Sequence, residues 1–287
     1  MPCHKLVLLC KNVLPWYSEM AGLLGKQVGG YSRYFDLRKL EERLPVRLYC
    51  GGIYNGIDKL QFDDEIANLG LTRTQEIVRT ICGTLRGIRI SRLDWCVDVG
   101  MPLLDLALYC QLRRAQNCAF IHSRTGPTVY LGRSKARVIY MYDKCRQLEA
   151  KGDPIAKNFD LMGPWTRVEV QYKGGGLPFR KFRNIERYAK LDMLADIAFW
   201  EVGRKRDGLS PTQTLAAEGL LRRIEEDGLQ VALKSFYPQE RAHILSRFLR
   251  PADESSFPDL NELMRKSVRE WLSDVIRFPR LRKRSHR

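Results

Sequence analysis

Residues Ile88-Arg-Ile-Ser-Arg-Leu-Asp-Trp-Cys-Val-Asp98 decide the fold. From Leu93 to Val97 every second residue is apolar, and successive side chains of a strand point to opposite faces of a sheet. The stretch is therefore predicted to be a half-buried strand. Its polar face presents two carboxylates, those of Asp94 and Asp98.

A helix is predicted on each side of this strand. Upstream, Thr72 and Gln75 have the spacing of a capping box, and the apolar residues that follow lie on one helical face. This pattern predicts a helix over roughly residues 73–86, stopped by Gly87. Downstream, the pattern of Leu103–Gln116 predicts a second helix.

Three further segments are predicted to be strands. Pro127–Leu131 and Arg137–Lys144 are expected to form a hairpin around residues 132–136. Trp165–Lys173 alternates in the same way as the first strand. Residues 1–60 combine short apolar stretches with glycine pairs, which is typical of strands joined by glycine turns.

After Gly176 the pattern becomes mostly helical, with one apolar stripe at Ala217–Ile224 and another at Leu260–Val275. The sequence thus predicts an α+β fold: an antiparallel sheet that carries the functional site, helices on its other face, and a helical C-terminal region. A boundary near residue 205 divides the strand-rich residues 1–205 from the helical residues 206–287.

The charge of the chain indicates a polyanionic partner. Its 287 residues include 49 Lys and Arg against 33 Asp and Glu, a formal charge of +16, and the surplus lies mainly in residues 1–205. Nucleic acid is favoured over an anionic membrane because the sequence has no basic amphipathic helix or long apolar run. No membrane association is expected.

The eight cysteines and four histidines are scattered, without a C-x-x-C pair. Neither a zinc module nor a disulfide framework is therefore predicted, and the cysteines are expected to be reduced thiols, mostly in the core. The apolar run Leu6–Cys10 is too short for the core of a signal peptide, so a cytoplasmic location is expected.

Three predicted strands present polar side chains at every second position. They are Asp94 and Asp98 on the first, Tyr140, Tyr142 and Lys144 on the second, and Arg167 and Glu169 on the third. If these strands are neighbours, carboxylates from two of them can hold a divalent cation, Mg²⁺ or Mn²⁺, that polarises a phosphate. A tyrosine beside it can attack phosphorus, with Lys144 or the cation lowering the cost of ionising the phenol.

Three motifs of the chain resemble those of the replication initiation factor family. They are Arg92-Leu-Asp-Trp-Cys-Val-Asp98; Tyr130-Leu-Gly132 followed by Ile139-Tyr-Met-Tyr-Asp-Lys144; and Trp165-Thr-Arg-Val-Glu169. The family comprises trans-acting rolling-circle replication initiators of small plasmids, initiators of some filamentous phages, and relaxases of small conjugative elements. The resemblance covers about residues 88–200.

This resemblance implies a site-specific DNA-nicking enzyme. Tyr142 stands in the position of the family's nucleophile, which becomes linked to the 5′ end of the cut strand and leaves a free 3′-OH. The resemblance also implies that Asp94 and Glu169 serve the metal, with Asp98 as a less certain ligand. Tyr140 is an addition to the family pattern on the same strand face, and it is an alternative nucleophile.

Cationic side chains around the motifs are predicted to contact DNA, because cations interleaved with rings are typical of single-strand grooves. They are Arg92, Arg133, Lys135, Arg137, Arg167, Arg180, Lys181 and Arg183. Residues 1–205 would then be the nicking domain. Residues 206–287 would be a helical DNA-recognition region with a basic tail from Arg277.

The expected partners are single-stranded or hairpin origin DNA, the flanking duplex and, by family precedent, a host helicase of the UvrD-like type; a homodimer is left open. Two other functions stay open as well. A conjugative relaxase would use the same chemistry at a transfer origin. A non-catalytic DNA-binding protein would use the basic surface alone, with the strand carboxylates in a structural role.

Overall fold

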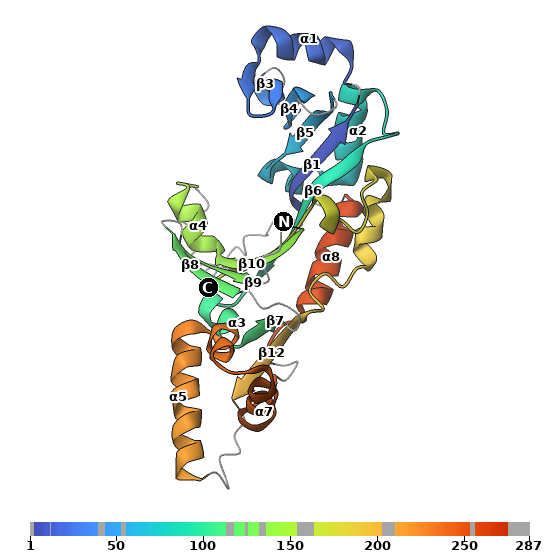
Figure 1. Cartoon of the computed structure of the whole chain (residues 1–287). Helices are drawn as coiled ribbons and strands as arrows, with labels where there is room; N and C mark the ends of the chain where they lie inside the picture. Colours follow the sequence, from blue (N-terminus) through green and yellow to red (C-terminus); the bar gives the residue numbers. More distant parts are fainter. Residues whose placement is uncertain are drawn as a thin grey trace, which may run out of the picture. The chain divides into compact units, whose positions relative to one another are not determined.

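The computed structural model describes residues 3–11, 13–39, 44–52, 56–112, 118–123, 126–131, 136–153, 164–202, 210–252 and 256–274 (Figure 1). It has the predicted α+β fold, in which helices accompany a large antiparallel sheet.

Within the described ranges, the main sheet has ten strands. They are β1 (Cys3–Cys10), β2 (Lys26–Val28), β3 (Tyr31–Asp36), β4 (Arg47–Gly52), β5 (Asp58–Phe62), β6 (Arg89–Val99), β8 (Cys118–Ser123), β9 (Gly126–Leu131), β10 (Arg137–Asp143) and β11 (Thr166–Lys173). Their order is β2-β3-β4-β5-β1-β6-β11-β10-β9-β8. A smaller sheet has the order β13-β12-β7, made of β7 (Cys110–Leu112), β12 (Ile197–Val202) and β13 (Leu249–Pro251).

The α-helices are α1 (Pro15–Leu24), α2 (Gly70–Cys82), α3 (Leu103–Leu108), α4 (Lys144–Ala150), α5 (Pro211–Asp227), α6 (Leu229–Ala232), α7 (Pro238–Phe248) and α8 (Leu260–Leu272). Short 3₁₀ helices are η1 (Leu37–Lys39), η2 (Asp64–Asn68), η4 (Gly174–Gly176), η5 (Phe182–Lys190) and η6 (Leu233–Ser235). None of the helices that the structure describes is long and apolar enough to cross a membrane.

The chain divides into two compact units. Unit 1 runs through Cys96 and takes in Tyr172–Leu191 and the chain from Met264 on, whereas unit 2 consists of Val97–Gln171 and Asp192–Leu263. Both units are discontinuous, so their limits do not follow the boundary predicted near residue 205. The assignment of a nicking domain to 1–205 and a recognition region to 206–287 stays a prediction.

Unit 1 buries the apolar face that the alternation of β6 predicts. Leu93 and Trp95 are inaccessible to solvent, and the rings of Trp95 and Trp271 meet edge to face at 5.5 Å. The Trp271 indole donates to the carbonyl of Ile66 at 2.9 Å, which satisfies its buried polar atom. The apolar stripe of α8 therefore covers this face of the unit, as the sequence predicts.

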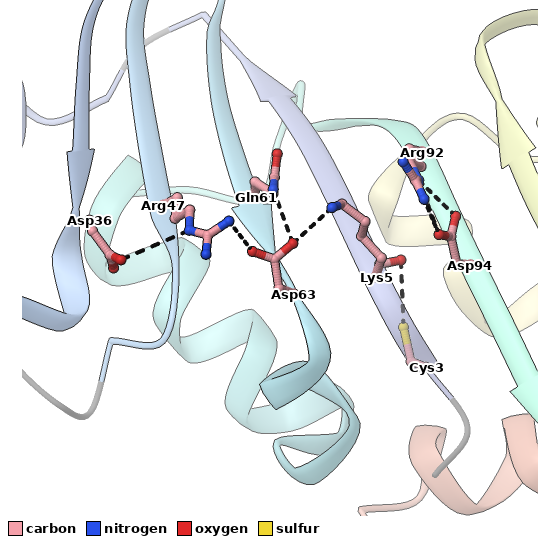
Figure 2. Close-up of polar contacts among 8 residues, drawn as sticks. All are labelled: Cys3, Lys5, Asp36, Arg47, Gln61, Asp63, Arg92 and Asp94. Carbon is pink, nitrogen blue, oxygen red and sulfur yellow. Dashed lines mark hydrogen bonds and ion pairs between the residues drawn. The ribbon is translucent and has the colours of Figure 1, made fainter. Parts of the chain in front are cut away.

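A chain of ion pairs crosses strands of unit 1 (Figure 2). Asp63 accepts from Lys5 at 2.9 Å and from Arg47 at 2.6 Å, and Arg47 also approaches Asp36 at 3.9 Å. These side chains come from β1, β3, β4 and the end of β5, so opposite charges alternate across neighbouring strands. Such cross-strand pairs support the strand register of this unit.

Unit 2 contains the predicted hairpin. Strands β9 and β10 are antiparallel and directly connected, as the sequence predicts, and β8 pairs with the outer side of β9. The helical part of the unit has a core of its own, made of Leu220, Ile224, Leu229, Ala232, Leu233, Ile244 and Leu249. The predicted stripe on α5 supplies the first two of these residues.

The predicted helix at 73–86 is present but displaced toward the N-terminus. Gly83, with φ of +71°, ends α2 four residues before the predicted stop at Gly87. The predicted capping box is wrong. Thr72 lies inside the helix, and its N–H donates to the carboxylate of Asp274 at 2.9 Å.

One other sequence prediction is wrong. The helix predicted at Leu103–Gln116 ends at Leu108, because Cys110–Leu112 instead form β7 and pair with β12. This tertiary pairing partner has overridden the local helical pattern. The described chain after Gly176 is mostly helical, as the sequence predicts, and β12 and β13 form a ladder within it.

The predicted state of the cysteines is confirmed for the seven whose side chains the structure describes. All are free thiols, and they are buried except for Cys145, which is partly exposed.

We predict that Asp274→Ala destabilises the protein by about 1 kcal/mol, the usual cost of losing a helix N-terminal cap. The carboxylate accepts from the N–H of Thr72 and also complements the positive end of the α2 dipole. Asp274→Asn is the matched control, because it keeps an acceptor and suits the positive φ of 58° at this position. Urea unfolding measures the stability of both variants. An alanine variant as stable as the wild type would rule out Asp274 as the cap of α2.

Candidate functional site

The hairpin of unit 2 places two tyrosines on one face of β10. Tyr140 lies opposite Tyr130 of β9 and Tyr142 lies opposite Thr128, with the fully buried Met141 pointing the other way between them. Period-two alternation therefore gives Tyr140 and Tyr142 the shared face that the sequence predicts.

Both tyrosines donate to one carboxylate. The hydroxyl of Tyr142 donates to Oε1 of Glu169 at 2.5 Å, and the hydroxyl of Tyr140 donates to Oε2 of the same residue. Glu169 lies on β11 and is inaccessible to solvent. Its two oxygens thus hold both phenols, and either phenol is within reach for transfer of a proton to the carboxylate.

The tyrosines form a ladder of rings. The rings of Tyr140 and Tyr142 stack with their centroids 6.1 Å apart, and those of Tyr130 and Tyr140 stack at 5.8 Å. Tyr142 is buried, whereas Tyr130 and Tyr140 are partly exposed. Tyr130 is predicted from sequence only as part of a motif. The hairpin register, in which Leu131 pairs with Ile139, places it opposite Tyr140.

Arg167 and Asp98 form a second polar contact in unit 2. Two nitrogens of the Arg167 guanidinium donate to the two oxygens of Asp98, at 2.5 and 2.7 Å. Burial opposes the ionisation of Asp98, but the charge and hydrogen bonds of Arg167, with the charge of Lys144, hold its pKa below the usual range. Arg167 is only 2% exposed, so in this arrangement it neutralises Asp98 and does not present a DNA contact.

Lys144 does not continue the strand as predicted. β10 ends at Asp143, whose side chain caps α4 by accepting from the N–H of Arg146, so Lys144 is the first residue of the helix. Its ammonium is buried and donates to Gln147 at 2.7 Å. Gln147 is not among the residues predicted from sequence. Its i, i+3 spacing from Lys144 on a helix is the signal that could have identified it as a partner of that lysine.

Asp94 belongs to unit 1 and lies on β6. Its carboxylate is inaccessible to solvent, and both of its oxygens accept from the guanidinium of Arg92, the closest contact being 2.5 Å (Figure 2). Arg92, a predicted DNA contact, is therefore engaged with a carboxylate. Asp94 and Glu169 fall in different units, and a ligand set that joins them stays a prediction.

Each of the three carboxylates predicted to bind a metal accepts hydrogen bonds from other side chains. Asp94 and Asp98 are each held by a guanidinium, and Glu169 accepts from two phenols. In the described ranges, no group of three or more His, Cys, Asp or Glu side chains is placed to hold a metal ion. A cation would require these carboxylates to exchange their donors.

The other predicted DNA contacts have different surroundings. Arg137 donates to Asp196 at 2.9 Å and to the carbonyl of Met193, so it joins β10 to the chain before β12. Arg180, Lys181 and Arg183 are exposed on unit 1. Arg133, Lys135 and the tail from Arg277 lie outside the described residues.

No family model matches the chain, and no curated protein matches it. Among solved structures, the chain is similar to the rolling circle replication initiator protein from Geobacillus stearothermophilus, with 14% sequence identity and a TM-score of 0.42 over 78% of this chain and 96% of that chain. At this identity and TM-score, the likeness contributes nothing to the function proposed below.

We predict that Asp98→Asn destabilises the protein by about 3 kcal/mol at pH 7, because it leaves the buried guanidinium of Arg167 without its counter-charge. The folded-state pKa of Asp98 lies below its unfolded value, so the stabilisation is present above about pH 4 and is lost as the pH falls through the folded-state pKa. The difference in unfolding free energy between wild type and variant should therefore shrink at acid pH.

The control is Glu226→Gln, which removes an exposed carboxylate of unit 2. It should change stability little at any pH. A difference between wild type and Asp98→Asn that stayed constant from pH 7 to pH 2.5 would contradict the assigned role of the ion pair.

Proposed function

We propose that the chain is a rolling-circle replication initiator that nicks origin DNA, single-stranded or extruded as a hairpin, with Tyr142 as the nucleophile. The observation that carries the proposal is the pair of tyrosine hydroxyls held by the buried carboxylate of Glu169. The formal charge of +16 and the resemblance of three motifs to the replication initiation factor family support it.

In the proposed reaction the Tyr142 oxygen attacks the phosphorus of one phosphodiester. An O–P bond to tyrosine forms while the bond from phosphorus to the 3′ oxygen breaks. The phenolic proton passes to Glu169, and the departing 3′ oxygen takes up a proton, giving a 3′-OH and a 5′-phosphotyrosine. Since one phosphodiester replaces another, the reverse attack by a 3′-OH can reseal the strand.

Tyr140 has a positioning role in this proposal. Its hydroxyl shares Glu169 with Tyr142, and its ring lies between those of Tyr130 and Tyr142. It therefore fixes the orientation of the carboxylate and of the neighbouring ring. A partly exposed ring in this position can also stack on a base of the bound strand.

Mg²⁺ or Mn²⁺ is the cofactor that the resemblance implies, and the need for one is part of the proposal. A bound divalent cation would neutralise charge on the oxygens of the scissile phosphate. Asp94, Glu169 and Asp98 are the residues assigned to it from sequence. The partners proposed with it are origin DNA with its flanking duplex, a host helicase of the UvrD-like type and, as an alternative to a monomer, a second copy of the chain.

We predict that Tyr142→Phe abolishes cleavage and the covalent adduct but still binds DNA, since only the attacking oxygen is removed. Tyr140→Phe should retain measurable nicking, because Glu169 keeps its contact with Tyr142. Both variants are incubated with Mn²⁺ and labelled single-stranded DNA from the element that encodes the protein. An adduct stable in SDS is then measured.

Peptide mapping by mass spectrometry identifies the linked residue. A nucleotide found on Tyr140, or an adduct that survives in Tyr142→Phe, would overturn the choice of nucleophile. The absence of any adduct from wild-type protein that binds the same DNA would favour a non-catalytic binding protein. An adduct formed only at a transfer origin would instead identify a relaxase.

We predict that Glu169→Gln abolishes nicking and leaves DNA binding intact, because an amide is a poor proton acceptor and a poor ligand for a hard cation. Nicking by the wild type should be lost in EDTA and restored by Mn²⁺. Asp94→Asn separates the two roles of the carboxylates, since Asp94 is proposed as a metal ligand and not as the proton acceptor. Full activity of Asp94→Asn would remove it from the ligand set, and nicking that survived EDTA would remove the metal.

A further inference from the structure

A basic pocket lies wholly within unit 1. Its volume is about 900 Å³, and it is bordered by the end of β1, the turn that follows α2, and the chain around Lys181. We call this cavity the unit 1 pocket. None of its lining residues belongs to the tyrosine site.

Backbone hydrogen bonds hold the walls of the unit 1 pocket together. The N–H of Ile90 donates to the carbonyl of Arg180 at 2.7 Å, and the N–H of Phe182 donates to the carbonyl of Ile88 at 3.1 Å. The two segments are far apart in sequence and form an antiparallel bridge between Arg89 and Lys181. The positive φ of Gly87, +81°, lets the chain turn into β6 directly before this bridge.

The polar lining of the unit 1 pocket is strongly cationic. Five basic residues line it, and all are exposed: Lys11, Arg86, Arg89, Lys181 and Arg183. No Asp or Glu is among the lining residues. Asp58 follows the lining residue Ile57 in sequence but is not itself in the lining. Its carboxylate accepts from the backbone N–H of Gly51 at 2.9 Å.

The five cations differ from the other predicted DNA contacts in their surroundings. Arg92, Arg137 and Arg167 are each paired with an aspartate. Among the residues that the structure describes, none of the five basic residues of the unit 1 pocket makes an ion pair. Charges of one sign gathered around a hollow attract an anion of opposite charge.

Apart from the cations and Thr84, the lining residues are apolar or small. Leu9, Ile57, Leu85 and Ile88 are among them, so the unit 1 pocket combines apolar side chains with cations. A nucleotide has the matching chemistry, because the flat faces of its base are apolar and its phosphates are charged. A base paired in a duplex is not available to such a pocket, whereas an unstacked base in a single strand is.

We propose that the unit 1 pocket binds an unstacked nucleotide of a DNA single strand, with the base against the apolar lining and the flanking phosphates at the five cations. This inference rests on the DNA-binding part of the proposed function and is independent of its nicking chemistry.

The test measures binding of a fluorescein-labelled 20-residue oligo-dT by anisotropy across a range of salt concentrations. Full-length protein carrying Tyr142→Phe, called the parent, is used throughout, so no cleavage can occur. The pocket variant adds Arg86→Gln, Lys181→Gln and Arg183→Gln. Loss of three phosphate contacts should weaken binding at least tenfold and flatten the slope of log affinity against log salt by about 2.

The matched control adds Lys26→Gln, Arg79→Gln and Lys190→Gln to the same background. These three cations are also exposed on unit 1, and the change in net charge is the same, but they lie outside the pocket. The control should keep the slope of the Tyr142→Phe parent. A third protein, with Arg86→Lys and Arg183→Lys in the same background, keeps the charges and should bind oligo-dT nearly as well as the parent.

Two further probes test the base and the strand. An oligonucleotide of the same length made of abasic residues should bind the parent about tenfold more weakly, since the base no longer fills the apolar lining. A 20-base-pair duplex should bind the pocket variant and the parent with similar affinity.

Equal losses in the pocket variant and the control would overturn the proposal. So would a loss on the duplex as large as on oligo-dT, which would make the unit 1 pocket part of a duplex groove. Failure of nicking is a separate result. Wild-type protein that binds through the unit 1 pocket but forms no adduct would refute the proposed reaction and leave the binding site in place.

Discussion

Buried charge on β11 constrains everything else in the tyrosine site. Arg167 and Glu169 lie two residues apart on the same face, and both are almost completely removed from water. A charge in that position is costly unless hydrogen-bond partners of suitable chemistry surround it. Asp98 of β6 and the tyrosines of β10 supply those partners. The polar contacts therefore fix which strand positions face one another, and a slip of one residue in register would leave both charges without partners.

The sequence predicts those parts of the fold that depend on short-range patterns. Alternation places Tyr140, Tyr142 and Glu169 on polar faces, and these three side chains do meet. The partner of each charged side chain cannot be predicted in this way, because it depends on which strands become neighbours. Asp98, the less certain of the predicted cation ligands, accepts from Arg167, a partner that local alternation does not predict. Lys144 leaves the strand because Asp143 caps a helix there. The cap of α2 comes from Asp274, about two hundred residues away in sequence, where no local motif could indicate it.

The distribution of cations separates two kinds of basic residue. In the tyrosine site and on β6, arginines are matched to aspartates and so contribute to the folded structure. Around the unit 1 pocket, the cations face a hollow with no carboxylate in its lining. The sequence does not distinguish a paired cation from an unpaired one. The predicted DNA contacts therefore include Arg92 and Arg167 together with Lys181 and Arg183. Only the tertiary partners of each side chain show which positive charges are available to a polyanion.

The sharing of Glu169 by two phenols also bears on how a tyrosine could be activated. A negative carboxylate beside a phenol opposes the formation of a free phenolate, because like charges would then face each other in a buried place. Lys144 donates to Gln147, and its positive charge helps to lower the pKa of Asp98. Transfer of the proton to Glu169 during the attack avoids this repulsion. As the tyrosine oxygen loses its proton, Glu169 becomes neutral, so the two groups together carry one negative charge until that charge spreads onto the phosphate. A carboxylate of this kind can receive only one proton, which limits each reaction to one of the two tyrosines.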